Sequence, residues 1–373
     1  MNTDHLERAL ALAHANAHIT PPNPSVGCVL VRADGVVIGE GATQATGGAH
    51  GEIMALRDAQ ARGNDVQGAS AYVTLEPCAH QGRTGPCSDA LVQAGIGRVV
   101  ATTGDPNPLV SGQGFARLRA AGMAVEVLAT DHPLALASRE LNIGFFSRML
   151  RGKPWVRMKI AASLDGQTAL DNGQSQWITS APARADGHAW RARVGAVLTG
   201  IGTVLEDNPR LDVRLFDTPR QPPLVVVDSR LETPLNAALF IAGRSVLIYA
   251  AVEDAVKQAA LEQAGATVVV CPGGGQKVDL QAMLADLHQR GIHEVHVEAG
   301  HKLNGSLVRE SLVDEFLVYL APKMLGAGRG MLNIGPFTEL SHGLELSFAS
   351  VERIGPDLRV LARVQGRDDF LHS

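Results

Sequence analysis

The stretch Ala71-Tyr72-Val73-Thr74-Leu75-Glu76-Pro77-Cys78 joins a run of mostly apolar residues to a cysteine. Residues 71–75 predict a buried strand, because short runs of this composition bounded by a proline favour strands. Cys78 follows that strand directly. Cys87 comes later, just before Ser88, which can cap a helix that ends at Gly95. Backbone N–H groups at a strand end and at a helix N-terminus favour thiolates, so this stretch predicts an α/β unit with two reactive sulfurs.

A histidine and a carboxylate lie upstream of these cysteines. His50 stands at the start of a predicted helix, residues 52–61, and Glu52 lies in its first turn. One His, two Cys and a Glu that is not a ligand form the H-x-E and P-C-x-x-C signature of zinc nucleobase deaminases. Three protein ligands leave one zinc position for water, which is typical of a catalytic site. Zinc lowers the pKa of such a water to roughly 7, and Glu52 would carry its proton to the leaving amine.

The spacing of the two cysteines departs from that signature. Eight residues separate Cys78 from Cys87, whereas the short motif has two. The longer spacing argues against plain cytidine or tRNA adenosine deaminases, and it brings His80 and Arg83 near the metal as candidate substrate contacts. The alternative is a structural zinc site with His80 as a fourth ligand, which would leave Glu52 without a role. We therefore favour catalytic zinc at His50, Cys78 and Cys87.

Strands and helices alternate along the whole chain, which predicts an α/β architecture. Residues 27–32 and 36–40 predict a hairpin, and residues 344–364 predict antiparallel strands at one edge of a second sheet. Helices are expected at 251–264 and 279–290. The remaining predicted strands are residues 98–102, 124–128, 155–161, 196–199, 224–228, 246–249, 267–270, 294–298 and 315–320.

Length and composition bound the number of domains and the class of partner. A chain of 373 residues with 45% apolar residues predicts two soluble domains, which we place at 1–147 and 148–373. A net charge of −5 without a basic block argues against nucleic acid and anionic membranes as partners. Four cysteines do not make a disulfide framework, and the N-terminus lacks the pattern of a secretory signal. We expect a cytoplasmic homo-oligomer.

Glycine-containing turns in the second half are weaker signals. Gly200-Ile201-Gly202-Thr203 follows a predicted strand, and Glu298 to Ser306 repeats that arrangement. Backbone N–H groups at such turns can hold an anion. Without further context, two ordinary strand-to-helix turns are the simpler interpretation.

Longer motifs make the chain resemble the bifunctional deaminase–reductases of riboflavin biosynthesis over nearly its whole length. In the first half the resemblance rests on Pro22 to Gly27, His50 with Glu52, Thr74 to Cys87, and Asp105-Pro106-Asn107-Pro108. In the second half it rests on four motifs: Lys159 to Gly166, Ser175-Gln176-Trp177-Ile178-Thr179, Asp207 to Leu211, and Glu298 with Gly300.

The resemblance implies two domains that catalyse successive reactions. A cytidine-deaminase-like α/β/α sandwich with one Zn²⁺ per chain would deaminate 2,5-diamino-6-(5-phosphoribosylamino)pyrimidin-4(3H)-one. A dihydrofolate-reductase-like α/β domain would use NADPH to reduce the ribosyl group of 5-amino-6-(5-phosphoribosylamino)uracil to ribityl. The partner of both sites would be a small phosphorylated pyrimidine.

The resemblance also implies site residues for both domains. In the deaminase half, Asn23, His80 and Arg83 are expected to contact substrate. In the reductase half, Lys159 and Asp207 are candidates for proton delivery or imine polarisation. The expected substrate contacts there are Ser175, Arg191, Leu211, Arg214 and Glu298. The expected NADPH contacts are Ala161, Trp177, Thr203, Asp207, Ser229, Gly300, His301, Lys302, Leu303, Asn304, Gly305 and Ser306.

Four positions depart from the family's pattern in the deaminase half. Many relatives have His at Thr43, a basic residue near Ala45 and a longer polar side chain at Met54, and Gly51 stands where Ala is expected. These changes affect how the first site would grip its substrate. Two alternatives remain open: a deaminase followed by a sensor or binding domain, and a zinc-stabilised binding protein without activity.

Overall fold

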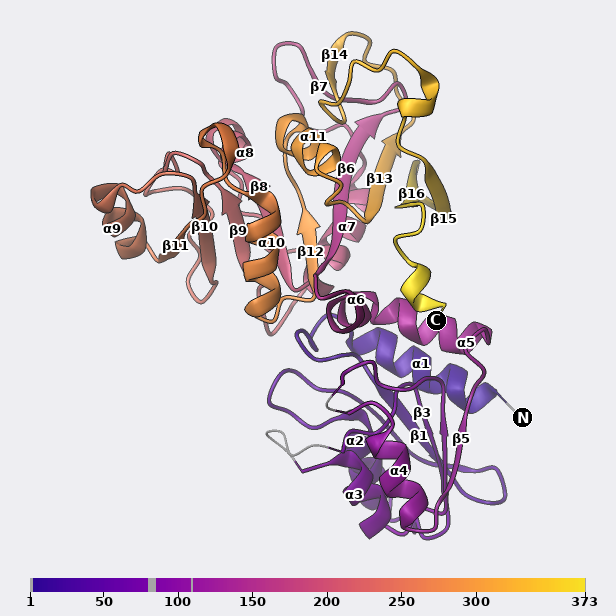
Figure 1. Ribbon diagram of the computed structural model, residues 1–373. Coiled ribbons are helices and arrows are strands. Elements are labelled where there is room, and N and C mark those ends of the chain that lie inside the picture. Colours follow the sequence, from indigo (N-terminus) through magenta and orange to yellow (C-terminus); the bar gives the residue numbers. More distant parts are fainter. Residues whose placement is uncertain (1–2, 80–84, 109, 373) are drawn as a thin grey trace. The chain divides into compact units, whose positions relative to one another are not determined.

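The computed structural model describes residues 3–79, 85–108 and 110–372 (Figure 1). The chain forms two compact units, Met1–Gly152 with Asp369–Ser373, and Lys153–Asp368. The division after residue 147 that the sequence suggested falls inside helix α6 (Ile143–Arg151), and the units divide where that helix ends at Gly152. No helix in the described ranges is long and apolar enough to span a lipid bilayer.

The first unit is built on a five-stranded mixed sheet in the order β2-β1-β3-β4-β5. Strand β1 is antiparallel to β2 and β3, whereas β3, β4 and β5 are parallel. The strands are β1 (Gly27–Val31), β2 (Val37–Ala42), β3 (Ser70–Val73), β4 (Arg98–Ala101) and β5 (Ala124–Val127). The helices are α1 (Asp4–Asn16), α2 (Gly51–Ala61), α3 (Cys87–Gln93), α4 (Gln113–Ala120), α5 (Pro133–Leu141), α6 and the short η3 (Asp369–Leu371).

Helices cover both faces of this sheet. Successive side chains of β1 point to opposite faces, and all of them are buried, so each face needs a covering helix. On one face, Leu6 and Ala9 of α1 pack against Val29 and Val31. On the other face lies α2, and its backbone comes so close that a Cβ on Gly41 of β2 would be 2.3 Å from the backbone nitrogen of Ala55. The unit is therefore the α/β/α sandwich predicted from the sequence, and α2 is held tightly against the sheet.

The second unit contains a nine-stranded sheet in the order β11-β10-β9-β8-β12-β6-β13-β16-β15. The strands from β11 to β13 in this order are parallel, and β16 and β15 add antiparallel strands at one edge, as predicted. The strands are β6 (Trp155–Ser163), β8 (Ala196–Gly200), β9 (Leu224–Val227), β10 (Val246–Ala250), β11 (Ala266–Val270), β12 (Glu294–Val297), β13 (Glu315–Ala321), β15 (Leu346–Ile354) and β16 (Asp357–Val364).

The helices of this unit complete the α/β architecture. They are α7 (Ala181–Arg193), α8 (Ile201–Asp207), α9 (Ala255–Gln263), α10 (Leu280–Gln289), α11 (His301–Arg309) and the short η1 (Gly274–Gln276) and η2 (Leu340–His342). The prediction that helix α9 starts at residue 251 is wrong. This helix begins at Ala255, because the Asp254 side chain accepts a hydrogen bond from the Lys257 N–H at 3.0 Å and caps the helix there. A two-stranded sheet of β7 (Gln167–Leu170) and β14 (Gly328–Gly330) was not predicted.

The two faces of the central strands differ in chemistry. Val156, Met158 and Ile160 of β6 face an apolar core with α10. The alternating residues Arg157 and Lys159 point to the opposite face, which α7 covers: the Arg157 guanidinium stacks on the Trp190 ring of α7 at 4.3 Å. Charged side chains are thus gathered under α7.

Arg157 is the centre of a buried ionic network on that face. Its guanidinium pairs with Glu294 of β12 and with Glu315 of β13, and Arg363 of β16 bonds the second oxygen of Glu315 at 2.9 Å. Burial favours the neutral acid, but Arg157 and Arg363 outweigh it and hold the pKa of Glu315 below its usual value. This network joins three adjacent strands to β16.

Replacing Arg157 with Ala is expected to destabilise the second unit by about 3–5 kcal/mol, because two buried carboxylates lose their partner. All three tryptophans, Trp155, Trp177 and Trp190, lie in this unit, so tryptophan fluorescence during urea unfolding reports on it alone. The exposed Lys257→Ala on α9 serves as the matched control and should change stability little. Equal stability of the Arg157 and Lys257 variants would contradict the role given to the network.

Candidate active sites

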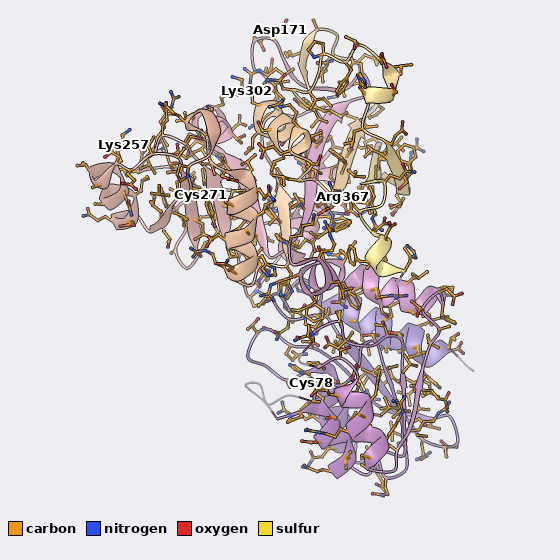
Figure 2. All side chains as sticks on the ribbon, viewed as in Figure 1. Cys78, Asp171, Lys257, Cys271, Lys302 and Arg367 are labelled. Atoms are coloured by element: carbon orange, nitrogen blue, oxygen red, sulfur yellow. The ribbon has the colours of Figure 1, made fainter. Side chains whose placement is uncertain are left out.

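Three zinc-ligand side chains meet in the first unit. The His50 Nδ1 atom lies 3.6 Å from Cys78 Sγ and 3.4 Å from Cys87 Sγ, and all three ligand atoms lie within 4.8 Å of one another. His50 precedes the first residue of α2, Cys78 follows β3, and Cys87 opens α3. Cys78 is labelled in Figure 2. The arrangement predicted from residues 50–87 is therefore assembled at the ends of a strand and two helices.

Local hydrogen bonds fasten the two cysteines together. The Cys87 N–H donates to Cys78 Sγ at 3.3 Å, and the Ser88 hydroxyl donates to the Cys78 carbonyl at 3.0 Å. The prediction that Ser88 caps the helix is wrong, because α3 starts at Cys87 with Pro86 at the cap position, and the Ser88 hydroxyl bonds the Cys78 carbonyl instead. Hydrogen bonding with Cys87 lowers the pKa of Cys78, which favours a thiolate there.

Glu52 lies in the first turn of α2, close to this cluster. Its side chain is buried, and burial together with the nearby Cys78 raises its pKa to about 7. The helix can approach this closely because residue 51 is glycine: a Cβ there would lie 2.6 Å from the Val26 carbonyl oxygen. Glycine at this position thus allows a close contact between α2 and Val26, the residue before β1.

A second buried carboxylate, Glu76, organises the loop that follows β4. It accepts hydrogen bonds from the N–H groups of Asp105, Gly112 and Phe115 at 3.2, 3.0 and 3.1 Å. The Asp105 carboxyl is buried beside it, and burial raises the pKa of Asp105 to about 7. The sequence analysis included Glu76 and Asp105 in motifs that resemble the family, but it assigned neither residue a role.

A large cavity of about 1710 Å³ lies in the second unit. It lies where β6, β8, β9 and β12 end, which is where ligands bind in open α/β sheets. Typical pockets for a single small ligand are about 300–1,000 Å³. The cavity therefore has room for a dinucleotide together with a second molecule.

A carboxylate held by two cations lies at the β6 end of this cavity. Arg191 donates from Nε to Glu298 Oε1 at 2.7 Å and from Nη2 to Oε2 at 2.9 Å, and Lys159 Nζ lies 3.8 Å from Oε2. Burial works against ionisation of Glu298, but Arg191 and Lys159 outweigh it and hold its pKa well below the usual range. Burial lowers the pKa of Lys159, although Glu298 opposes this. The arrangement places an ammonium group of lowered pKa beside a carboxylate that stays ionised.

Family models match both units. Residues 1–103 match the cytidine and deoxycytidylate deaminase zinc-binding region, and residues 154–360 match the RibD C-terminal domain. The riboflavin biosynthesis protein RibD of Escherichia coli is 40% identical over 364 residues, covering 95% of this chain and 97% of the relative. That of Aquifex aeolicus is 37% identical over 358 residues, covering 96% and 97%. The chain belongs to the RibD family.

Solved structures agree with this assignment. Acinetobacter baumannii RibD superposes with a TM-score of 0.86 at 38% identity, covering 97% of this chain and 98% of that one. A Thermotoga maritima diaminohydroxyphosphoribosylaminopyrimidine deaminase/5-amino-6-(5-phosphoribosylamino)uracil reductase has a TM-score of 0.84 at 31% identity, covering 97% and 98%. The chain is a bifunctional enzyme of riboflavin biosynthesis, with a zinc-dependent deaminase domain and an NADPH-dependent reductase domain.

The residues of the RibD deaminase domain fit a zinc ion. One imidazole nitrogen and two sulfurs converge from three elements, and that donor set suits zinc. Asn23 lies in the loop before β1, where its N–H donates to the Thr20 carbonyl at 2.9 Å, and no described hydrogen bond joins its side chain to the ligands. His80 and Arg83 lie outside the described residues.

The RibD reductase cavity likewise fits a dinucleotide. Asn304 of α11 lines it and has a buried Oδ1 atom that lacks a hydrogen-bond partner within the described part of the chain. The turns at Gly200 and Gly300 approach each other through Leu303 and Thr203: a Cβ on Gly200 would lie 3.0 Å from the Leu303 side chain, and one on Gly300 would lie 3.8 Å from Thr203 Oγ1. An unsatisfied amide oxygen beside two tight turns is suited to a polar ligand.

Nearly all residues predicted for the reductase site line this one cavity. Gly305 does not: a Cβ there would lie 2.2 Å from the Asn333 carbonyl oxygen, so this glycine lets the residue 333 backbone pack onto α11. The predicted residues that line the cavity are Lys159, Ala161, Ser175, Trp177, Arg191, Thr203, Asp207, Leu211, Arg214, Ser229, Glu298, Gly300, His301, Lys302, Leu303, Asn304 and Ser306.

Sequence reasoning missed other polar residues around this RibD site. His188 of α7 lines the cavity and accepts a hydrogen bond from the Arg214 N–H at its Nδ1 atom, at 3.4 Å; burial lowers its pKa to about 4. Arg329 of β14 reaches Glu206 of α8 at 2.7 Å and lines the cavity from the unpredicted small sheet. His296 is fully buried, with its Nε2 atom 3.7 Å from Glu298 Oε1. These residues belong to no local motif, so only the tertiary structure identifies them.

Proposed function

We propose that the first unit hydrolyses the C2 amine of 2,5-diamino-6-(5-phosphoribosylamino)pyrimidin-4(3H)-one. The second unit then reduces the ribosyl group of the resulting 5-amino-6-(5-phosphoribosylamino)uracil to ribityl. The observation that supports both assignments is that two separately built sites contain the groups each reaction needs. His50, Cys78 and Cys87 converge beside buried Glu52, and Lys159 and Arg191 converge on Glu298.

In the deamination, Glu52 moves the protons. His50, Cys78 and Cys87 would hold zinc, which would act as a Lewis acid and make water a better nucleophile. Glu52 would take a proton from water as the water oxygen bonds to C2, and would deliver a proton to the amine as the C2–N bond breaks and ammonia leaves. Burial raises the pKa of Glu52, which helps the same carboxyl to accept and return a proton near neutral pH.

In the reduction, Lys159 donates the proton that opens the sugar ring. The C1–O4 bond of the ribosyl group breaks as O4 takes this proton, and the adjoining nitrogen forms a C1=N iminium group. When bound in the cavity, NADPH would supply the hydride that C1 needs to become the ribityl amine. Glu298 holds Lys159 and Arg191 in place. Asp207, exposed at the end of α8 with a pKa raised by partial burial and by Glu206, is the second candidate for the donor.

Arginine contacts to the substrate phosphate complete the reductase site. Arg191 is committed to Glu298, whereas the Arg214 side chain is 47% exposed and pairs only at one nitrogen, Nη1, with Asp212 at 2.8 Å. Its other N–H donors would bind the substrate phosphate, because a guanidinium can hold a phosphate through paired hydrogen bonds. Ser175 and Leu211 would contact the remainder of the same molecule.

The experiment that tests this proposal follows ammonia release and NADPH absorbance in one reaction with zinc-loaded protein and the diaminopyrimidinone ribosyl phosphate. We expect ammonia first and NADPH oxidation after it, in equal final amounts. Ammonia without NADPH oxidation would make the second unit a sensor or binding domain. Neither signal would make the chain a zinc-stabilised binding protein.

The proposal includes a homo-oligomer built through strand β15. This strand ends the nine-stranded sheet, and Leu346, Phe348 and Val351 on it are 43%, 75% and 54% exposed. Phe337 and Leu340 in the preceding segment are also exposed. A long apolar edge strand invites pairing with another strand, and a second copy of this chain offers an identical edge.

Replacing Phe348 with Glu is therefore expected to shift the protein toward monomer, because the substitution buries a charge at the shared edge. Sedimentation velocity at several protein concentrations measures the change. Val256 is exposed on α9, away from β15, and Val256→Glu is the control that adds the same charge there. It should leave the assembly intact. A monomeric wild type, or an oligomer unaffected by Phe348→Glu, would rule out β15 as the interface.

A further inference from the structure

We propose that Ser229, Arg230 and Lys277 form the site that recognises the 2′-phosphate on the adenosine ribose of NADPH, and so select NADPH over NADH. The inference rests on the proposed reductase function and extends it to cofactor specificity. It depends on three observations: the position of these residues along the cavity, the hydrogen bonds that the neighbouring Asp228 makes, and the charged groups that lie near Ser229.

The cavity crosses the sheet from the reaction end to these residues. Lys159 lies on β6 and Glu298 follows β12, whereas Ser229 and Arg230 follow β9, three strands away from β6 in the order β6-β12-β8-β9. At about 4.8 Å per strand, that distance is roughly 14 Å. All of these residues line the same cavity, and the Gly200 and Gly300 turns lie between its two ends. If hydride transfer occurs beside Lys159, the adenosine half of the cofactor occupies the β9 end.

The acid that would favour NADH is turned away from this end. In dinucleotide-binding sheets an acidic residue after a strand binds the ribose 2′-hydroxyl of NAD, and an Arg nearby accommodates the 2′-phosphate of NADP. Asp228 directly follows β9, but it is fully buried, and its Oδ2 atom accepts hydrogen bonds from both the N–H and the hydroxyl of Thr233 at 2.7 Å. Ser229 and Arg230, the next two residues, line the cavity in its place.

A loop after β11 brings Lys277 to the same end. The Gly273 N–H donates to the Lys277 carbonyl at 2.7 Å, and the Val278 N–H donates to Ser229 Oγ at 3.3 Å. The second bond joins the loop to Ser229, and the Ser229 hydroxyl hydrogen remains available to a ligand. Lys277 and Arg230 both line the cavity beside it.

The acidic groups at this end compete with a phosphate only partly. Asp279 lines the cavity but caps α10, accepting from the Ala282 N–H at 2.9 Å. Glu232 lies 3.2 Å from the Arg230 guanidinium, and both side chains are exposed, so water screens this pair. A phosphate of charge near −2 can displace a single carboxylate from Arg230. Glu232 therefore acts as an internal competitor for the same guanidinium.

Adenosine 2′,5′-bisphosphate and 5′-AMP differ only by the 2′-phosphate and test the inference by direct binding. Isothermal titration calorimetry with the full-length zinc-loaded protein should show tighter binding of the bisphosphate. In the double variant Arg230→Gln/Lys277→Gln, the affinity of the protein for the bisphosphate should fall about 10- to 100-fold. The reason is that hydrogen bonds to charged groups contribute about 1.5–3 kcal/mol. Binding of 5′-AMP should change less than about 3-fold, and Glu232→Gln should strengthen bisphosphate binding because it removes the competitor.

The exposed Arg119→Gln on α4, in the first unit and outside the cavity, is the charge-matched control and should retain the wild-type preference. The inference is overturned if the double variant keeps that preference, or if it loses both nucleotides equally. An unchanged preference in a variant that still oxidises NADPH would refute this inference and leave the reductase function standing. A wild type that neither binds the bisphosphate nor oxidises NADPH would refute both.

Discussion

Replacing Glu52 with Gln is expected to lower the deamination rate constant by about 10³-fold, because positioned proton transfer contributes roughly 10²–10⁴-fold to such reactions. The amide has almost the same shape as the carboxyl but cannot shuttle a proton between water and amine. Glu52 lies outside the His50, Cys78 and Cys87 ligand set, so zinc content should stay at one per chain. Ammonia release under saturating substrate measures the loss, and metal analysis verifies the zinc.

Two comparisons make the Glu52 result specific. The exposed Glu7→Gln on α1 removes a carboxylate from the same unit and should deaminate at the wild-type rate. NADPH oxidation by Glu52→Gln, measured on the deaminated intermediate, should be unchanged, because the reductase cavity lies in the other unit. Substantial ammonia release by the zinc-loaded variant would remove Glu52 from the mechanism.

Replacing Lys159 with Met should lower the reductase rate constant by about 10²–10⁴-fold, because the methionine keeps the stem but has no proton to donate. NADPH oxidation on the deaminated intermediate measures it, while ammonia release from the first substrate should persist. The exposed Lys257→Met on α9, labelled in Figure 2, is the matched control. If Asp207 is the donor instead, Asp207→Asn will show the large loss and Lys159→Met a small one.

The pH dependence of the reductase supplies a second readout for Lys159. A lysine that donates a proton is active only while protonated, so activity should fall as pH rises through its pKa. Burial lowers the pKa of Lys159, which places this fall below the ordinary lysine value of about 10.4. Lys159→Arg keeps its charge at every accessible pH and should abolish that alkaline limb. An identical alkaline limb in the arginine variant would assign it to another group.

The deaminase ligands could be predicted because each one lies beside a helix or strand that is visible in the local sequence. His50 and Glu52 share one helix turn, and Cys78 follows a strand whose apolar run is visible in the sequence. Local periodicity also predicted the edge strands at residues 344–364 and the helix at residues 279–290. Ser88 was misjudged because a hydroxyl near a helix start has two possible partners, and only packing showed that it bonds Cys78.

The sequence by itself determined the zinc donor set, the two-unit α/β architecture and the family, because these depend on short-range patterns and on long motifs in order. The tertiary structure alone decided which distant residues act together. Lys159, Arg191 and Glu298 are far apart in the chain, and they meet because β6 and β12 are neighbours in the sheet and α7 covers that face. The tertiary structure also turns Asp228 inward and leaves Ser229 and Arg230 at the cavity, because Thr233 donates two hydrogen bonds to the buried Asp228 carboxylate.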